Sequence, residues 1–344
     1  MSEPMIEPPS APFSAPPSAP DLIAAAAQRL AAGGLVAFPT ETVYGLGARA
    51  DDDAAVAAIF AAKGRPSEHP LIVHLAQAGA AREFAAHISS DAQRLMKAFW
   101  PGPLTLIVPR RAGRAQAAAA GQNSIGLRVP SHPMALALLQ ACEQRGVAGL
   151  AGPSANRFGR VSPTSAAHVM QEFGPGLMVL DGGPCSVGIE STIIDCTGPA
   201  PALLRPGQLA VQDLERVLSR PLAAAHAASP RASGTLESHY APAVPLRLFS
   251  QPDLLRALAS AAAGPGKVLA VYSRLKCRQL EAALRAHPEW LFKAMPDDAD
   301  AAAQELFSTL RQLETAGVQA IWVEQPPQGT AWDGVRDRLT RAAA

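Results

Sequence analysis

The sequence predicts two α/β domains: a mixed, strongly twisted open sheet, followed by a smaller doubly wound domain. In the first part of the chain, short apolar runs of strand length have helices between some of them and not others, which does not fit a repeating βαβ array. After residue 246, strands and helices alternate regularly over about 100 residues. A chain of 344 residues, 48% of them hydrophobic, is long enough to fill two cores.

Composition divides the chain into four segments. The first 20 residues are saturated with Pro, Ser and Ala, and they carry acidic residues where a signal peptide needs basic ones. Residues 219–245 are rich in the same three residue types and are crossed by the polar element Ser238-His239-Tyr240. We therefore expect a disordered tail (1–20), a mixed-sheet domain (21–218), a linker that also serves as a lid (219–245) and a small doubly wound domain (246–344).

The first elements of the mixed sheet are predicted from apolar periodicity and capping residues. Residues 35–38 form an apolar run of strand length that ends at a proline. Residues 51–53 are aspartates that can cap a helix over 54–62, which delivers Lys63 near its C-terminal end. A second apolar strand follows at 71–75.

The remaining elements rest on the same signals. We expect strands at 104–108, 125–129, 177–181, 191–196, 202–205, 246–249, 268–272 and 320–323. We expect helices at 22–32 capped by Asp21, at 77–87, 91–100, 133–142, 254–262 and 279–286, at 301–316 capped by Asp300, after Ser162 or Thr164 as cap, and at the end of the chain to residue 342.

Charge and cysteine usage exclude several classes of protein. The net charge is only +1, which argues against a polybasic nucleic-acid binder, but residues 61–130 hold nine basic and three acidic residues, an excess of +6 that favours an anionic ligand. The four cysteines form no C-x-x-C pair, so neither a zinc site nor a disulfide framework is supported. No apolar run reaches the roughly 18 residues of a membrane helix. We expect a soluble, cytoplasmic protein.

Polar side chains gather where the predicted elements end. Thr42 follows the first strand, Lys63 and Arg65 follow the helix, and His74 ends the second strand. Strand ends meet at one edge of an open sheet, so these residues predict a polar pocket there. Each charge-assisted hydrogen bond contributes about 1.5–3 kcal/mol, so a few converging cations can orient a triphosphate without a glycine-rich loop. Taken singly, each charge could equally be a hydrated surface group.

Two other motifs are weaker. The run GLGARA at 45–50 fits a dinucleotide-binding fingerprint, but the aspartates that follow would end the helix that the fingerprint must open. Cys185 and Ser154 are conceivable nucleophiles, although neither has a recognisable base and orienting group in the sequence. We therefore do not expect covalent catalysis.

Several blocks resemble one protein family. They are PTETVYGLG (39–47), KGRPSEHPLIVHL (63–75), SIGLRVPSHP (124–133), GPSANRFGRVSPTSAAHV (152–169), GIESTIID (188–195), LLRPG (203–207) and SHYAP (238–242). In this order and spacing they are similar to the long, two-domain form of the YrdC-like threonylcarbamoyl-AMP synthases, over roughly residues 21–344. The resemblance implies that residues 21–218 form a YrdC-like catalytic domain.

The resemblance also implies roles for individual residues. It assigns catalysis to Lys63 and Arg65. It places L-threonine among Thr42, His74, Arg128, Gly152 and Ser191. It places ATP among Lys63, Arg65, His69, Ser124, Ser154, Ser162, Arg205 and Tyr240, although the family usually has Asn where His69 stands. Their chemistry suits these roles. An arginine can hold a carboxylate bidentately, and hydroxyl side chains can distinguish the amine of the substrate from its hydroxyl group.

The implied reaction joins L-threonine, bicarbonate or CO2 and ATP into L-threonylcarbamoyladenylate, with release of pyrophosphate. A nucleotidyltransferase of this kind must hold the carbamate in line with the α-phosphorus and exclude water, since both the carbamate and the mixed anhydride are labile. Magnesium is expected with ATP, although no set of carboxylate ligands is visible in the sequence. By resemblance, the product passes to the transferase that makes N6-threonylcarbamoyladenosine in tRNA.

The residues by themselves also allow two other functions. A non-catalytic binder of double-stranded RNA or tRNA would use the +6 stretch to follow phosphates, although an aromatic content of 5% disfavours a stacking platform. An accessory domain acting on carbamoyl phosphate is the third interpretation. Consumption of ATP that depends on threonine and bicarbonate, with no RNA present, separates the synthase from an RNA binder. The same assay run with carbamoyl phosphate separates it from the third interpretation.

Overall fold

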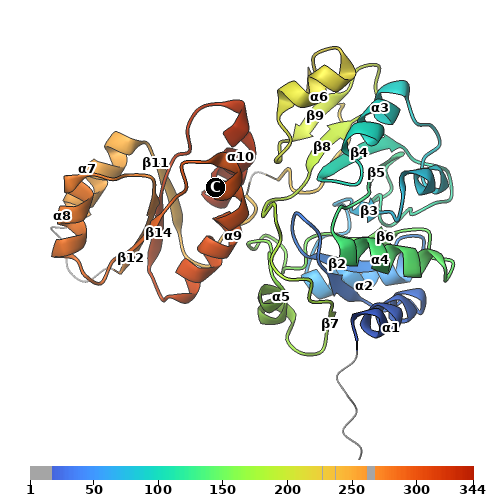
Figure 1. The fold of residues 1–344 in the computed structure, drawn as a ribbon, viewed down its shortest axis with the longest axis horizontal. Helices are drawn as coiled ribbons and strands as arrows, with labels where there is room; N and C mark the ends of the chain where they lie inside the picture. Colours follow the sequence, from blue (N-terminus) through green and yellow to red (C-terminus); the bar gives the residue numbers. More distant parts are fainter. Residues whose placement is uncertain (1–17, 227, 237, 262–267) are drawn as a thin grey trace, which may run out of the picture.

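The computed structural model describes residues 18–226, 228–236, 238–261 and 268–344, which form two sheets (Figure 1). The ten-stranded mixed sheet has the order β10-β9-β8-β4-β5-β3-β6-β2-β1-β7, and the four-stranded parallel sheet has the order β11-β14-β12-β13. A mixed open sheet followed by a small doubly wound domain was predicted, and this fold class is confirmed. Within the described residues, no helix combines the length and the apolar character that crossing a membrane requires.

The large sheet carries helices on both faces. Its strands are β1 (Val36–Phe38), β2 (Gly45–Arg49), β3 (Ile72–His74), β4 (Leu104–Pro109), β5 (Ser124–Arg128), β6 (Leu150–Ala151), β7 (Met178–Val179), β8 (Thr192–Asp195), β9 (Ala202–Arg205) and β10 (Ala223–Ala224). Its helices are α1 (Ala19–Ala31), α2 (Asp53–Lys63), a 3-10 helix (Ala78–Glu83), α3 (Ser90–Phe99), α4 (Pro133–Glu143), α5 (Ala166–Phe173) and α6 (Val211–Leu218). Helices α1 and α4 pack with Val36 and Phe38, whereas Ala37 between them faces the core that includes α2, α3 and α6.

Helix α2 brings the basic loop to the sheet edge. The Asp52 side chain accepts hydrogen bonds from the backbone N–H groups of Ala54 and Ala55, which caps the helix as expected. Gly64 ends it in the left-handed conformation, with φ of 63°. Lys63 therefore lies in the last turn, and Arg65 begins the loop that leads to β3.

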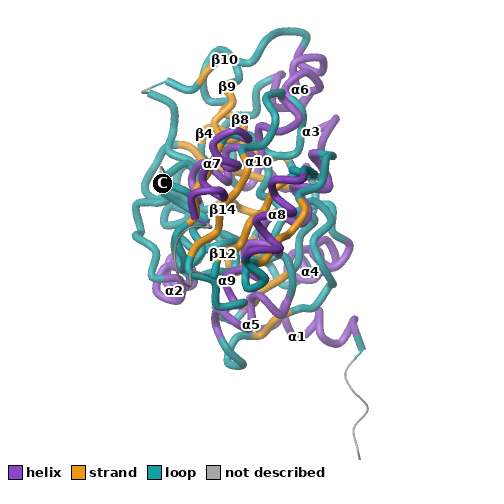
Figure 2. Tube along the Cα trace, turned by 90° about the vertical axis from the view of Figure 1, so that its left-hand side faces the viewer, coloured by secondary structure: helices purple, strands orange, loops and turns teal. Residues whose placement is uncertain are grey.

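The second domain has a helical layer on each face of its sheet. Its elements are β11 (Leu246–Phe249), α7 (Gln251–Ala261), β12 (Leu269–Ser273), α8 (Arg278–Ala286), β13 (Leu291–Ala294), α9 (Ala299–Thr315), β14 (Ala320–Glu324), a 3-10 helix (Thr330–Trp332) and α10 (Asp333–Ala342). Along β12, Leu269 and Val271 pack with α7 and α8, while Ala270 and Tyr272 pack with α9 and α10. Figure 2 shows α7 and α8 over the side of this sheet that faces away from the first domain.

The two domains share an apolar core. Val43, Val161 and Ile189 of the first domain belong to the same buried cluster as Phe307 and Val335 of α9 and α10. Helices α9 and α10 accordingly lie between the two sheets (Figure 1). The approach is close at Gly188, with φ of +83°, where an added Cβ would lie 2.4 Å from the Gln304 carbonyl oxygen. The second domain is thus packed directly against the first.

Several boundaries differ from the prediction. Ser18, not Asp21, caps α1, and Asp21 completes the capping box at the third helical position. Ser165 caps α5 in place of Ser162 or Thr164, and Asp298 caps α9 in place of Asp300. In each case several cap-type residues stand within one turn of each other, so sequence alone does not decide between them.

One predicted helix was wrong in extent, and several elements of the structure were not predicted. The predicted helix over 77–87 is only the short 3-10 helix, and β2, β6, α6 and β13 were not predicted. The predicted linker contains β10, which pairs with β9. The predicted disordered tail falls largely on residues 1–17, which lie outside the described residues; residues 18–20 cap and open α1.

Candidate active site

A polar cavity lies where β3, β5, β8, β9 and the loop after β6 come together, and linker residues cover it. All five residues predicted to hold threonine line it: Thr42, His74, Arg128, Gly152 and Ser191. His74 and Arg128 are direct partners across the parallel pair β3 and β5, so one register places both at the cavity. The structure therefore brings the predicted amino-acid residues together.

Arg128 differs from the expectation in its partners. Its Nη2 donates to Glu41 Oε1 at 2.6 Å, its Nη1 donates to Thr42 Oγ1 at 2.9 Å, and its Nε donates to the Gly102 carbonyl. Glu41 is nearly buried, and its second oxygen accepts the Ser131 N–H. In this structure both terminal nitrogens of Arg128 therefore already have protein partners. Any substrate carboxylate must share the guanidinium with Glu41, whose role as partner the sequence did not reveal.

His74 is buried and neutral. Burial, together with the nearby cation Arg128, lowers the pKa of His74 to about 3. Its Nδ1 has no hydrogen-bond partner within the described residues, and a Cβ added to Gly152 would lie 2.8 Å from this atom. The imidazole therefore packs directly against the Gly152 backbone, where a side chain would not fit.

The predicted nucleotide residues fall into two groups. Arg65, Ser154, Arg205 and Tyr240 line the cavity. The other four do not, and each lies elsewhere: Ser124 lines a smaller neighbouring cavity, Ser162 donates to Glu190, His69 stacks obliquely on Phe158, and Lys63 lies behind the Ser154 loop. Of the two residues predicted to be catalytic, the structure brings Arg65 to the cavity and not Lys63.

Arg65 and Arg205 converge on the same linker residue. Arg65 Nη2 is 3.3 Å from Ser233 Oγ, and Arg205 Nη1 donates to the Ser233 carbonyl at 2.9 Å. Arg205 Nη2 also donates to the Ser191 carbonyl at 2.8 Å, which ties the nucleotide half to the threonine half. Burial lowers the pKa of Arg65 to about 10, so the guanidinium remains charged at neutral pH. Two buried cations thus face the covered cavity.

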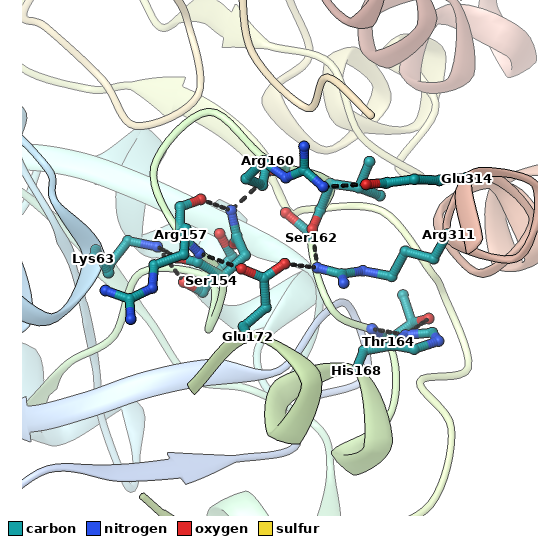
Figure 3. Close-up of polar contacts among 12 residues, drawn as sticks. Lys63, Ser154, Arg157, Arg160, Ser162, Thr164, His168, Glu172, Arg311 and Glu314 are labelled. Atoms are coloured by element: carbon teal, nitrogen blue, oxygen red, sulfur yellow. Dashed lines mark hydrogen bonds and ion pairs between the residues drawn. The ribbon is translucent and has the colours of Figure 1, made fainter. Parts of the chain in front are cut away.

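Lys63 supports the cavity wall from behind. Its Nζ donates to the backbone carbonyls of Ser154, at 2.6 Å, and Asn156 (Figure 3). The Phe158 N–H donates back to the Lys63 carbonyl, so the loop is fixed to the end of α2. Burial, and next the cation Arg65, lower the pKa of Lys63 well below its ordinary value. The Lys63 side chain therefore holds the loop that presents Ser154.

Sequence reasoning missed other cavity residues. Among them are Thr40, Glu190, Ser233 and Gly234, together with His239, which was expected only as part of the linker element over the pocket. Glu190 lies inside the GIEST block and His239 beside Tyr240, so the blocks were a signal for both. Ser233 and Gly234 lie in a run of small residues that carries no periodic pattern, and only the folded path of the linker brings them to the cavity.

The site offers little for a metal ion. Across the part of the chain that the structure describes, no group of three His, Cys, Asp or Glu side chains could hold one. Glu190 is the carboxylate among the cavity-lining residues, and both of its oxygens already accept hydrogen bonds. These residues do not form a preorganised magnesium site.

Gly152→Ala should weaken threonine binding. The new Cβ would stand 2.8 Å from His74 Nδ1 and 3.3 Å from the Phe38 ring, which forces the imidazole to move. We expect the KM for threonine to rise about tenfold, since a displacement of this kind costs about 1–3 kcal/mol. Steady-state kinetics with threonine varied is the measurement. Gly176→Ala, where no atom lies within 4 Å of the new Cβ, is the matched control and should match wild type.

Acid should destabilise the fold through two histidines. Burial lowers the pKa of both His74 and His239 to about 3, whereas an unfolded histidine titrates near 6.5. Below pH 6.5 these histidines become protonated in the unfolded chain but stay neutral in the native one. The free energy of unfolding therefore falls by about 2 kcal/mol per histidine between pH 6.5 and 5. Urea denaturation at pH 7 and 5 measures the loss. His74→Gln should reduce it by less than half, because burial also lowers the pKa of His168, to about 4, and that partly buried imidazole adds to the loss. A stability that is flat over this interval would count against neutral buried imidazoles.

The fold and cavity define a two-domain α/β protein whose cavity combines buried cations with hydroxyl groups. The family model described as "Telomere recombination" matches residues 28–207, and the model of the threonylcarbamoyl-AMP synthase C-terminal domain matches residues 209–344. The chain therefore belongs to the family of threonylcarbamoyl-AMP synthases, which confirms the resemblance seen in the sequence blocks.

Individual relatives agree. The threonylcarbamoyl-AMP synthase of Pyrococcus abyssi is 36% identical over 322 residues, which cover 90% of this chain and 91% of that protein. The Bacillus subtilis enzyme of the same name is 42% identical over 233 residues, 66% of each chain. The crystal structure of P. abyssi Sua5 complexed with L-threonine has a TM-score of 0.83 at 34% identity, covering 93% of this chain and 94% of that one.

Proposed function

We propose that this protein forms L-threonylcarbamoyladenylate and pyrophosphate from L-threonine, bicarbonate and ATP. The observation that carries the proposal is the cavity itself, in which the Arg65 and Arg205 cations and the predicted threonine residues are buried together. Membership of the family and the likeness to a threonine-bound relative support it.

In the proposed reaction, threonine and bicarbonate first lose water to give the N-carboxylate of threonine. A carbamate oxygen then attacks the α-phosphorus of ATP, and the bond to pyrophosphate breaks. The carbamate supplies the electron pair, so no protein nucleophile is required. Burial raises the pKa of Cys185 to about 12, which keeps that thiol protonated and agrees with non-covalent catalysis.

The residues of the cavity have separate tasks in this proposal. Arg65 and Arg205 bind the phosphates and stabilise the charge that develops at the transition state. Lys63 holds the Ser154 loop in place. On the other side, Arg128, with Glu41 behind it, and the hydroxyl of Thr42 orient the amino acid. The geometry thus accounts for catalysis by positioning and by exclusion of water.

Magnesium, in this proposal, arrives with ATP and is held chiefly by the phosphates. It neutralises charge on the triphosphate when bound. Because both Glu190 oxygens already accept hydrogen bonds, we assign no protein ligand to the ion.

We further propose that the linker element 238–240 acts as a lid. Tyr240 is fully buried over the cavity, its hydroxyl has no partner within the described residues, and its φ of +63° lies in a region that non-glycine residues rarely occupy. A Cβ on Gly234 would lie 2.2 Å from this hydroxyl, so the two linker stretches fit tightly together. Opening of such a segment would admit ATP, and closing it would exclude water.

The labile product must be consumed by a transferase, which we take to be the one that modifies tRNA. Measuring pyrophosphate release with each substrate omitted in turn tests the function. We expect release only when ATP, threonine and bicarbonate are all present, with no RNA required. Release that proceeds without threonine, or RNA binding without any release, would contradict the proposal. Replacing bicarbonate with carbamoyl phosphate in the same assay distinguishes the proposed function from the alternative in which the protein acts on carbamoyl phosphate.

A further inference from the structure

A carboxylate lines the cavity that is proposed to hold a triphosphate. Glu190, just before β8, is 7% exposed and contributes to the cavity wall. Ser162 Oγ donates to its Oε1 at 2.5 Å, and Arg338 Nε donates to its Oε2 at 2.7 Å. An anion in this position would repel the phosphates if it were not compensated. Its cationic partner therefore matters to nucleotide binding.

The partner comes from the second domain. Arg338 belongs to α10, is 0% exposed, and does not line the cavity itself. Besides the Glu190 carboxylate, its guanidinium donates to the backbone carbonyls of Pro206 and Glu190 and to Asp337. Its centre also lies 5.3 Å from the centroid of the Tyr240 ring. One side chain thus contacts the cavity wall, the end of β9 and the linker.

The same helix also fixes the linker that covers the cavity. The His239 N–H donates to the Arg341 carbonyl at 3.1 Å, and the Arg341 guanidinium donates to the Leu236 carbonyl. Ser238 Oγ donates to the carbonyl of Ala344 at 3.1 Å. Helix α10 and the residues after it therefore hold the linker residues that directly precede Tyr240.

We propose that Arg338 is a positioning residue for the active site, which neutralises and orients Glu190 and supports Tyr240 from the second domain. The nucleotide half of the cavity is then complete only with α10 in place. This inference rests on the proposed function, because it concerns the binding of ATP in that cavity.

The charges around Glu190 give the proposal a pH signature. The groups that face it are Arg338 and Asp337 of α10, Arg205 of β9, Lys63 of α2, and His239 and Tyr240 of the linker. Burial alone would raise the pKa of Glu190, but Arg338, and next Arg205, hold it below its ordinary value. His239 has a pKa of about 3 and Tyr240 one of about 12, so both stay neutral between pH 6 and 8. Without Arg338, the pKa of Glu190 should rise.

The test is the affinity of magnesium-ATP, measured by isothermal titration calorimetry at pH 6 and pH 8. The proteins are wild type, Arg338→Met, Arg338→Lys, and the double variant Glu190→Gln/Arg338→Met. Arg311→Met is the matched control, because Arg311 also forms a nearly buried ion pair across the domain interface, with Glu172, away from the cavity lining (Figure 3). Circular dichroism establishes that each protein is folded.

At pH 8, Arg338→Met should weaken ATP binding by about tenfold or more, and the loss should shrink at pH 6 as Glu190 takes up a proton. The double variant should return to within about threefold of wild type at both pH values, because a neutral amide does not repel phosphate. Arg338→Lys keeps the charge and should show little pH dependence. Arg311→Met should bind ATP as wild type does, although its melting temperature should fall.

Three results would overturn the proposal: ATP affinity that Arg338→Met leaves unchanged, a double variant as weak as the single one, or an Arg311→Met variant that loses ATP to the same extent. If Arg338→Met does not fold, Arg338→Lys and the double variant decide the question by the same criteria. ATP binding without pyrophosphate release in wild type would count against the proposed function alone. Wild type that binds no ATP would overturn both.

Discussion

Arg205→Met should lower kcat/KM for ATP by about 100- to 1,000-fold, the largest catalytic loss that we expect from a single side chain. Two or more charge-assisted hydrogen bonds are removed at once, each contributing about 1.5–3 kcal/mol. Arg205 is 2% exposed and stands at the end of β9, from which its Nη groups reach the Ser191 and Ser233 carbonyls. Initial rates of pyrophosphate release with ATP varied provide the measurement.

The matched control is Arg216→Met. Arg216 lies on α6, with a side chain that is 73% exposed and paired with Asp213 one turn away. Surface pairs of this kind contribute little, so we expect kinetics and stability within about 0.5 kcal/mol of wild type. If Arg205→Met retained its ATP kinetics while folding normally, Arg205 would have no role in the nucleotide site.

Arg128→Met should cost about 3–5 kcal/mol of the free energy of unfolding and abolish measurable threonine binding. Removing the guanidinium leaves Glu41 as a buried carboxylate without a cation beside it, because the side chains of Arg128 and Glu41 are only 4% and 6% exposed. It also removes the donor to Thr42 Oγ1 at the threonine side of the cavity. Chemical denaturation measures the first effect, and calorimetric titration with threonine measures the second.

A double variant separates the effect on stability from the effect on threonine binding. Glu41→Gln/Arg128→Met no longer contains the stranded charge, so it should recover much of the stability while threonine binding remains lost. Arg256→Met, which breaks an exposed pair with Asp253, should leave stability and threonine binding unchanged. Threonine binding that returned in the double variant would refute a direct role for Arg128 in recognition.

The elements that the sequence predicted well have strong local signals. Helix α2 has an aspartate cap and a terminal glycine, and β4 is a mostly apolar run between two prolines. The segment that forms β2 is glycine-rich and has few β-branched residues, so only its pairing with β1 and β6 makes it a strand. The edge strand β13 is largely exposed, and its pairing with β12 defines it. Helix α6 carries apolar residues at helical spacing and could have been predicted.

The residues of the site also divide into those that the sequence predicted and those that only the fold reveals. Residues such as His74 and Arg128 stand at strand ends, and the sequence blocks identified them. Their partners depend on contacts that no local pattern encodes, since Arg338 lies 148 positions from Glu190 and Arg128 lies 87 positions from Glu41. Lys63 illustrates the remaining difficulty. Its place at the end of α2 was evident, but the direction of its side-chain nitrogen, toward two backbone carbonyls, follows from the fold.

The central claim is that one cavity joins an amino-acid carbamate to the α-phosphorus of ATP. The most direct measurement is mass spectrometry of the products formed from ATP, L-threonine and carbon-13 bicarbonate. We predict a threonylcarbamoyl adenylate that carries the heavy carbon and forms in equal amount to pyrophosphate. Conversion of ATP to ADP and phosphate, or an adenylate of threonine without the labelled carbon, would contradict the account.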